Sequence, residues 1–366
     1  MTGVGRVAWA ALILFVSLAL FCSGAPVPSL LASAPPVPEK PAPEKNDKTG
    51  KHHHRQDGSA PVDEARRAYE ASDYAHAVQL LQAASAHDPS NAEIKLLLAK
   101  NYYELQQSDA AVAAAEKAVA LAPQNSVYHE WLGRAFGQKA EHAMWFSAIG
   151  LARKARREFQ AAVDLDQRNF SAQQALIEFD CSAPGIVGGG EDKARVEIAR
   201  VADLDESEGH YARGVCRREK KNFAEADAEF AMALDAHPTS VALIYDIGDY
   251  AVRRQQGDRL LAVADMGQKL APEDPRGAYY RAVGFILKYE NLPEAEESLR
   301  AYLDHPRLRS DYPHLSWVQE WLARSLEKQG KLDAARQEYE AAIKSDPKNK
   351  NAKESLKRLG KTSSDD

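Results

Sequence analysis

The chain has 366 residues, 45% of them hydrophobic, so it is long enough to bury a large apolar core. Its 47 basic and 53 acidic residues give a net charge of −6, which argues against a field that attracts nucleic acid or another polyanion. Three cysteines without a Cys-x-x-Cys pair exclude a zinc ribbon and a dense disulfide framework.

The composition of residues 1–24 predicts an export signal. Arg6 precedes an uncharged run of 16 residues, Val7 to Cys22, which is short for a membrane-spanning helix and close to the core of a secretory signal. Ser23-Gly24-Ala25 offers a cleavage pattern of small residues, although Pro26 follows it. Lipidation at Cys22 and retention as an anchor are the alternatives. We expect an exported protein that is periplasmic or anchored facing the periplasm, with membrane contact only through this segment if it is uncleaved.

Residues 25–61 predict a disordered linker. Seven prolines lie between Pro26 and Pro43, a composition that favours an extended, solvated spacer. His52-His53-His54 is a metal-binding pattern in principle, but a flexible solvated run is the simpler interpretation. No metal site is predicted.

Residues 62–361 predict tandem helix–turn–helix units. Prolines recur at steps of 34 residues, as in Pro89 to Pro123 and Pro238 to Pro272. In the unit that ends at Pro238, small residues at Gly214, Ala226 and Ala233 let two amphipathic helices approach, and Phe230 fills the space beside them. This pattern resembles the tetratricopeptide repeat family. The resemblance implies an all-α, right-handed superhelical solenoid of about eight hairpins, with a C-terminal capping helix and a disordered tail at residues 362–366.

The same resemblance implies a concave groove, lined mainly by the first helix of each hairpin, that binds a protein or peptide. One column of tyrosines recurs at steps of 34 residues, and arginines lie near it; the candidate groove residues are Tyr211, Tyr245, Tyr279, Arg134, Arg218 and Arg253. The alternative is that the tyrosines pack between helices. The lysine and asparagine positions of a carboxylate clamp for a chaperone tail are not matched.

Two hairpins have lengthened turns. Gly133 to Ala155 spans 22 residues, where Gly214 to Ala226 spans 12. The next hairpin contains Ala183–Gly190, APGIVGGG, and the combination resembles exported bacterial tetratricopeptide proteins.

Because the turns of neighbouring hairpins emerge on one edge of a solenoid, the two lengthened turns are predicted to form one composite site. The apolar residues of the first turn, Met144, Trp145, Phe146 and Ile149, would have an apolar partner in Ile186 and Val187. If the composite is functional, Trp145 and Phe146 would be exposed anchors for a partner. Local packing of the two turns is the alternative.

Chemical motifs are sparse. Gly188–Gly190 is followed by Glu191-Asp192 rather than by the Gly-Lys-Ser/Thr of a phosphate loop, so it predicts a tight turn and not a nucleotide site. No metalloprotease or serine-hydrolase motif occurs in the sequence.

Cys181 and Cys216 are predicted not to form a disulfide, because their positions on neighbouring first helices differ by about 200° of helix rotation. The sequence therefore predicts no cofactor and no enzyme.

The function that this pattern favours is an exported scaffold or adaptor for a protein partner of unknown identity. An accessory or degenerate catalytic module that uses the lengthened turns is one alternative, and a self-associating structural protein is another. A pull-down from the cell envelope distinguishes a scaffold, which requires a partner, from self-association, which does not.

Overall fold

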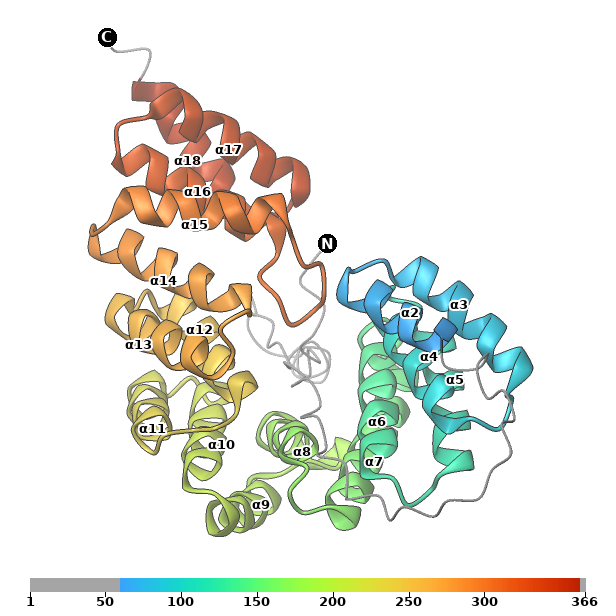
Figure 1. Ribbon diagram of the computed structural model, residues 1–366. Helices are drawn as coiled ribbons and strands as arrows, with labels where there is room; N and C mark the ends of the chain where they lie inside the picture. The colour runs from blue at the N-terminus through green and yellow to red at the C-terminus, as the bar shows by residue number, and fades with distance from the viewer. Residues whose placement is uncertain (1–59, 363–366) are drawn as a thin grey trace, which may run out of the picture. The chain divides into compact units, whose positions relative to one another are not determined.

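The computed structural model describes residues 60–362, so the predicted signal segment, the linker and nearly all of the tail lie outside the described residues. Between residues 60 and 362 the chain folds into 17 α-helices and one short 3₁₀ helix, with no β-strand (Figure 1). The helices form eight consecutive hairpins and a final helix, which confirms the predicted all-α repeat fold with its capping helix.

The hairpins pair a first and a second helix in chain order. They are α2 Ala60–Glu70 with α3 Tyr74–His87, α4 Ala92–Glu104 with α5 Ser108–Leu121, α6 Ser126–Glu141 with α7 Trp145–Leu165, and α8 Phe170–Ser182 with α9 Glu191–Leu204. They continue as α10 Glu206–Glu219 with α11 Phe223–Asp235, α12 Val241–Arg254 with α13 Gly257–Leu270, α14 Pro275–Lys288 with α15 Leu292–Asp304, and α16 Leu315–Lys328 with α17 Leu332–Ser345. The capping helix is α18 Lys350–Thr362, and the 3₁₀ helix η1 Gly185–Val187 lies between α8 and α9.

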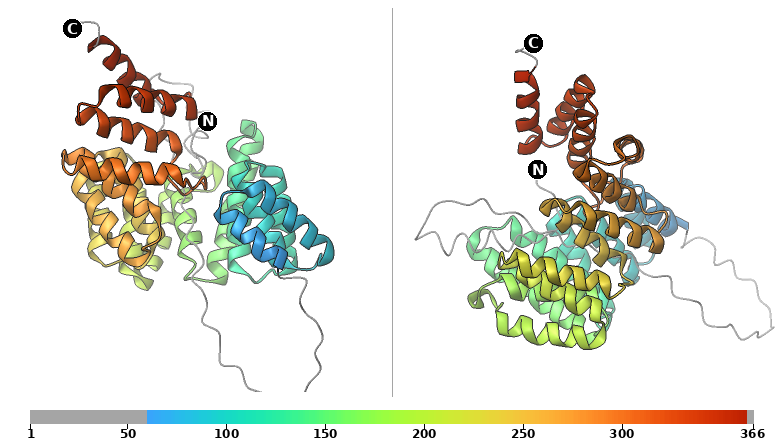
Figure 2. Two further views of the ribbon diagram at one scale, coloured as in Figure 1. Left: turned by 45° about the horizontal axis from the view of Figure 1, so that its top comes forward. Right: turned by 90° about the vertical axis from the view of Figure 1, so that its left-hand side faces the viewer.

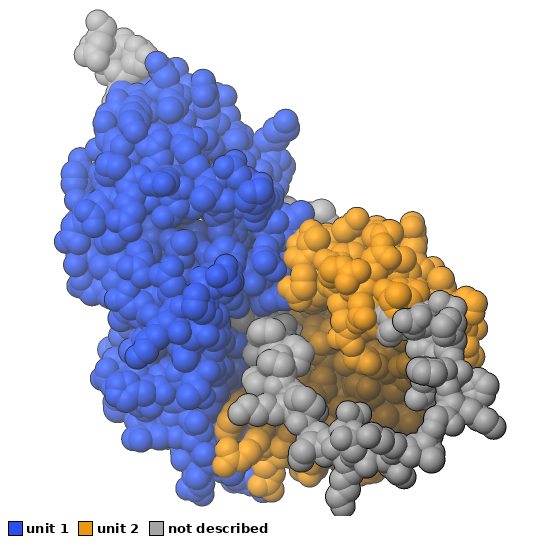
Figure 3. Space-filling model, viewed as in Figure 1, with its two compact units in different colours: residues 1–32, 173–366 blue, residues 33–172 orange. Residues whose placement is uncertain are grey.

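The described residues form two compact units, 60–172 and 173–362, whose boundary falls within α8 (Figure 3). Within each unit consecutive hairpins stack side by side (Figure 2). The right-handed sense of the whole superhelix stays a prediction.

Small polar residues begin many of these helices. The side chain of the residue before the helix accepts a hydrogen bond from a backbone N–H of the first turn, which satisfies a donor that has no partner inside the helix. Helices with such a cap include those that follow Asp73, Asn91, Asn125, Asp205, Asn222, Ser240 and Asp274.

The short turns inside hairpins share one backbone device. A residue takes the left-handed conformation one or two positions after the first helix, with φ between 54° and 77°, and so reverses the chain within a few residues. These residues are Ser72, Gln106, Lys221, Gln255, Tyr289 and Gly330. The two lengthened turns lack this arrangement: His142, the residue after α6, has φ −103°, and the turn after α8 runs through η1.

The core follows the predicted packing of rings against glycine. A Cβ on Gly214 would lie 2.6 Å from the ring of Phe230, so only glycine lets the second helix bring this ring so close. The ring of Tyr245 uses Gly267 in the same way, at 2.2 Å. This contact explains why the second helix of the sixth hairpin departs from the usual pattern of small residues.

Candidate partner-binding site

The three tyrosines predicted to line one exposed surface are buried. Tyr211, Tyr245 and Tyr279 are 5%, 1% and 2% exposed. The Tyr211 hydroxyl donates to Asp246 of the next hairpin, and the Tyr245 ring lies 5.3 Å from the ring of Tyr280. Burial and the nearby Asp246 carboxylate raise the pKa of Tyr211 well above its ordinary value, so the hydroxyl remains a donor. The prediction of an exposed tyrosine surface was wrong, because these rings fill the space between successive hairpins.

Two of the three candidate arginines are buried as well. Arg134 is 2% exposed and donates to Glu130 at 2.9 Å. Arg218 is 9% exposed and donates to Glu178 at 3.0 Å. The first pair lies within α6 and the second joins α10 to α8. A guanidinium buried against a carboxylate offers little to a partner. Arg253 is exposed and remains a candidate.

Cys181 and Cys216 form a disulfide, which contradicts the prediction that they would not. Their Cα atoms lie 5.3 Å apart, on the neighbouring first helices α8 and α10. A rotation of about 200° between the two positions brings the cysteines together and does not separate them. Two parallel helices that lie side by side face each other with opposite sides, so residues that differ by about half a turn are the ones that meet.

The glycine-rich turn is held by its own backbone, as the tight-turn interpretation requires. The Gly190 N–H donates to the carbonyl of Asp180 at 2.9 Å, and a Cβ on Gly189 would lie 2.2 Å from the carbonyl oxygen of Ala183. Val187 is 1% exposed and anchors the turn. The segment therefore closes the α8–α9 hairpin as a tight turn.

The other lengthened turn exposes its apolar residues. Met144 is 67% exposed, and Trp145 and Phe146 are each 60% exposed at the start of α7. Ile186 belongs to the other compact unit, so the predicted composite of the two turns stays a prediction.

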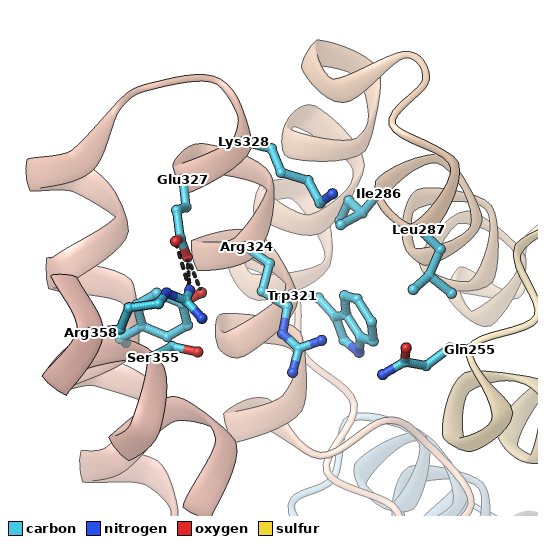
Figure 4. A pocket seen from close by; sticks show the side chains of 10 residues that line it. Gln255, Ile286, Leu287, Trp321, Arg324, Glu327, Lys328, Ser355 and Arg358 are labelled. Atoms are coloured by element: carbon cyan, nitrogen blue, oxygen red, sulfur yellow. Dashed lines mark hydrogen bonds and ion pairs between the residues drawn. The ribbon is translucent and has the colours of Figure 1, made fainter. Parts of the chain in front are cut away.

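A cavity of about 610 Å³ lies among the last hairpins (Figure 4). We call it the C-terminal cavity. It is lined by the ends of α12 and α14, by α16 and α17, and by the capping helix α18: Gln255, Ile286, Leu287, Trp321, Arg324, Glu327, Lys328, Tyr339, Ser355 and Arg358. Most of its lining comes from first helices and the cap, where the resemblance places the groove.

Cation–aromatic stacking shapes one side of this cavity. The Arg324 guanidinium lies 4.5 Å from the centre of the Trp321 ring and pairs with Glu320 at 2.6 Å. The Lys328 ammonium lies 4.6 Å from the ring of Tyr289. Such stacking holds long basic side chains in place while leaving donors for a ligand.

An ion pair forms the opposite side. Arg358 of α18 donates to both carboxylate oxygens of Glu327, at 2.6 and 2.7 Å, and the Tyr339 hydroxyl donates to the same carboxylate at 2.9 Å. Two of the three cations in the lining are paired, Arg324 with Glu320 and Arg358 with Glu327. The third, Lys328, adds positive charge that suits a ligand with a carboxylate.

Sequence reasoning missed this cavity. The candidate groove residues did not include Arg324, because they were chosen beside a column of tyrosines that is buried. The signal was the clustering of basic residues at the end of one first helix and on the lysine-rich cap, next to a tryptophan: Trp321, Arg324, Lys328 and Arg358.

Within residues 60–362, no cluster of three or more histidine, cysteine or acidic side chains is arranged to hold a metal ion. No helix among them is long and apolar enough to cross a membrane.

Two segments match models of the tetratricopeptide repeat, residues 68–134 and residues 319–356. These segments cover the second hairpin with its flanking helices in one unit, and α16–α17 with the start of the cap in the other. No curated protein matches the chain in sequence.

Solved helical-repeat structures are similar to parts of the chain. One is the Cut9–Hcn1 hetero-tetramer of the APC/C, at 14% identity and a TM-score of 0.45, covering 82% of this chain and 56% of that one. A second is MamA, at 21% identity and a TM-score of 0.36, covering 47% of this chain and 93% of that one. A tetratricopeptide repeat protein from Parabacteroides merdae covers 82% of this chain and 98% of its own, at 11% identity and a TM-score of 0.38. The chain therefore spans little more than half the length of the first of these structures.

Proposed function

We propose that this protein is an exported scaffold that binds a protein or peptide partner, and that the C-terminal cavity is its docking site. The observation that carries the proposal is the cavity lining, in which Lys328 and Arg324, the latter held against the ring of the buried Trp321, present positive charge. Tandem tetratricopeptide repeats typically serve as scaffolds for protein interaction. The positive lining favours a partner segment that carries carboxylates.

Export is supported by the disulfide. Cross-links of this kind persist in oxidising compartments such as the periplasm and are rare in the cytosol. The bridge between Cys181 and Cys216 agrees with the uncharged run at Val7 to Cys22, which predicts an export signal.

Charge reversal in the cavity tests the binding site. The full chain is used to capture partners from the cell envelope, alongside an Arg324→Glu/Lys328→Glu variant. The matched control is Lys344→Glu, which changes an exposed lysine of α17 outside the cavity. We expect the control to capture the same partner as the unmodified chain and the cavity variant to lose it, since two like charges would oppose the carboxylates.

Other outcomes decide between the alternatives. If both variants capture the partner equally, the C-terminal cavity is not the docking site. If no partner is captured and the chain sediments as a concentration-dependent oligomer, the self-associating protein replaces the scaffold.

A further inference from the structure

The lengthened turn between α6 and α7 stands clear of its neighbours in the same unit. Ala155 of α7 and Ala111 of α5 are matching, fully buried positions. Helix α7 begins ten residues before Ala155, whereas α5 begins three residues before Ala111. The seven additional residues extend α7 by about 10 Å, or nearly two turns, beyond the edge of the preceding hairpin.

The end of this extension is apolar and exposed. Met144, Trp145 and Phe146 are consecutive, and each is at least 60% exposed. The rings of Trp145 and Phe146 meet edge to face, with centres 5.9 Å apart. The next turn faces inward, since Ala148 and Ala152 are 2% and 0% exposed. The three exposed side chains therefore form a compact apolar tip, Met144–Phe146, rather than the edge of the core.

Positive charge follows the tip along the same helix. From Trp145 to Arg157 the helix contains four basic residues and no acidic one. Lys154 lies eight residues from Phe146, or about 12 Å along the axis, and Arg157 is 69% exposed. Nearby acidic charge is limited: Glu141 ends α6, Glu158 is buried against His129 and Arg157, and Asp109 pairs with Lys139.

We propose that the Met144–Phe146 tip inserts into the interface of an anionic lipid bilayer. Tryptophan and other aromatic side chains favour the level of the lipid headgroups, and lysine and arginine extend their charged ends to phosphate while their stems stay in apolar surroundings. An apolar end followed by a basic stretch fits an anionic bilayer in both charge and polarity. A protein partner would need acidic groups arranged around an apolar pocket, whereas a lipid surface supplies both everywhere. This inference does not depend on the C-terminal cavity.

The emission of Trp145 provides the test. The full chain is mixed with phosphatidylcholine vesicles that contain phosphatidylglycerol and brominated acyl chains, and a Trp145→Phe variant is measured beside it. The difference between the two spectra isolates Trp145 from the other four tryptophans, including any in the N-terminal segment. We expect this difference emission to shift to shorter wavelength and to be quenched by the brominated chains.

Charge variants define the mechanism. Lys154→Gln and Arg157→Gln are each expected to weaken the response of Trp145 about fivefold in vesicle titrations. The matched control is Lys117→Gln, which removes an exposed charge from α5 away from the tip and should change nothing. Neutral vesicles, or high salt, should reproduce the loss.

Two results would overturn the proposal. One is Trp145 emission that stays unchanged and unquenched with anionic vesicles. The other is an equal response with neutral vesicles, since the basic residues would then play no part. If Trp145 responds only when an envelope protein is added, the tip docks a protein instead.

Discussion

The hairpins α4–α5 and α6–α7 lie side by side in one unit. They bury equivalent core residues but differ in the turn that joins their two helices. Both bury three equivalent side chains of the second helix completely: Ala111, Ala115 and Ala118 in one, and Ala155, Phe159 and Ala162 in the other. The first closes through the left-handed Gln106, whereas the second continues for two more turns and exposes an aromatic tip. The repeat pattern thus determines the buried core positions of a hairpin, whereas the length and side chains of its turn can vary.

The largest contrast is expected between two phenylalanines of α7. Phe159 is 0% exposed and fills the space beside Gly133, so Phe159→Ala should leave a cavity and cost about 3–5 kcal/mol. Phe146 is 60% exposed, and Phe146→Ala should change stability by no more than about 0.5 kcal/mol. Urea unfolding of both variants measures the difference. Equal losses would mean that the tip is packed and not available for binding.

The other lengthened turn differs because a disulfide holds its first helix to the next hairpin. Cys181→Ser/Cys216→Ser opens a loop with a sequence separation of 35 residues, which should cost about 2–4 kcal/mol. The unmodified chain should lose the same stability in reductant, while the double variant should not respond to it. A variant that melts at the temperature of the oxidised chain would show that the bridge contributes nothing.

Periodicity predicted the hairpins because a 34-residue step leaves a strong pattern of small residues and prolines. The pairing of Gly214 with Phe230 was predictable, since both lie at fixed positions of the repeat. The faces were not. Tyr211 recurs with the same step whether it points to a groove or to the next hairpin, and periodicity alone cannot separate the two.

The cavity and the disulfide depend on how one first helix faces the next. Cys181 and Cys216 meet because parallel neighbours present opposite sides, which a comparison of matching positions does not reveal. Arg358 reaches Glu327 from the capping helix, outside the repeat that set the expected pattern. The length of the turn that contains Trp145 and Phe146 was visible in the sequence, but length alone did not distinguish their exposure from local packing.

A buried acid gives a hairpin with short turns a pH dependence. Glu208 of α10 is 3% exposed and accepts from Gln174 at 2.8 Å, and burial raises its pKa to about 7. The folded chain then holds a proton that the unfolded chain has released, so stability falls as pH rises from about 4.5 to about 7 and is level above that. The expected loss is on the order of 3 kcal/mol.

Glu208→Gln should remove this loss, because an amide oxygen still accepts from Gln174 without carrying charge. We expect the variant to be more stable than the unmodified chain at pH 8 and similar to it at pH 5, by thermal unfolding. Glu206→Gln, an exposed acid on the same helix, is the control and should leave the pH profile unchanged. A profile that is also unchanged in Glu208→Gln would place the titration elsewhere.

The smallest effect on stability is expected in the turns between the two helices of a hairpin. Lys221 is an exposed residue in the left-handed conformation, with φ 60°, and Gly330 occupies the equivalent place in the last hairpin with φ 77°. Side chains with a Cβ are strained there, so Lys221→Gly should gain up to about 1 kcal/mol and Gly330→Ala should lose about as much. A Cβ on Gly330 meets nothing within 4 Å, so the loss of stability in Gly330→Ala would come from the backbone alone.

His142 follows the first helix of the lengthened hairpin and has φ −103°. His142→Gly should bring no gain in stability, since glycine there only adds freedom to the unfolded chain. Thermal unfolding of the three variants compares the turns directly: a gain at His142 equal to that at Lys221 would show that the long turn uses the same reversal as the short ones.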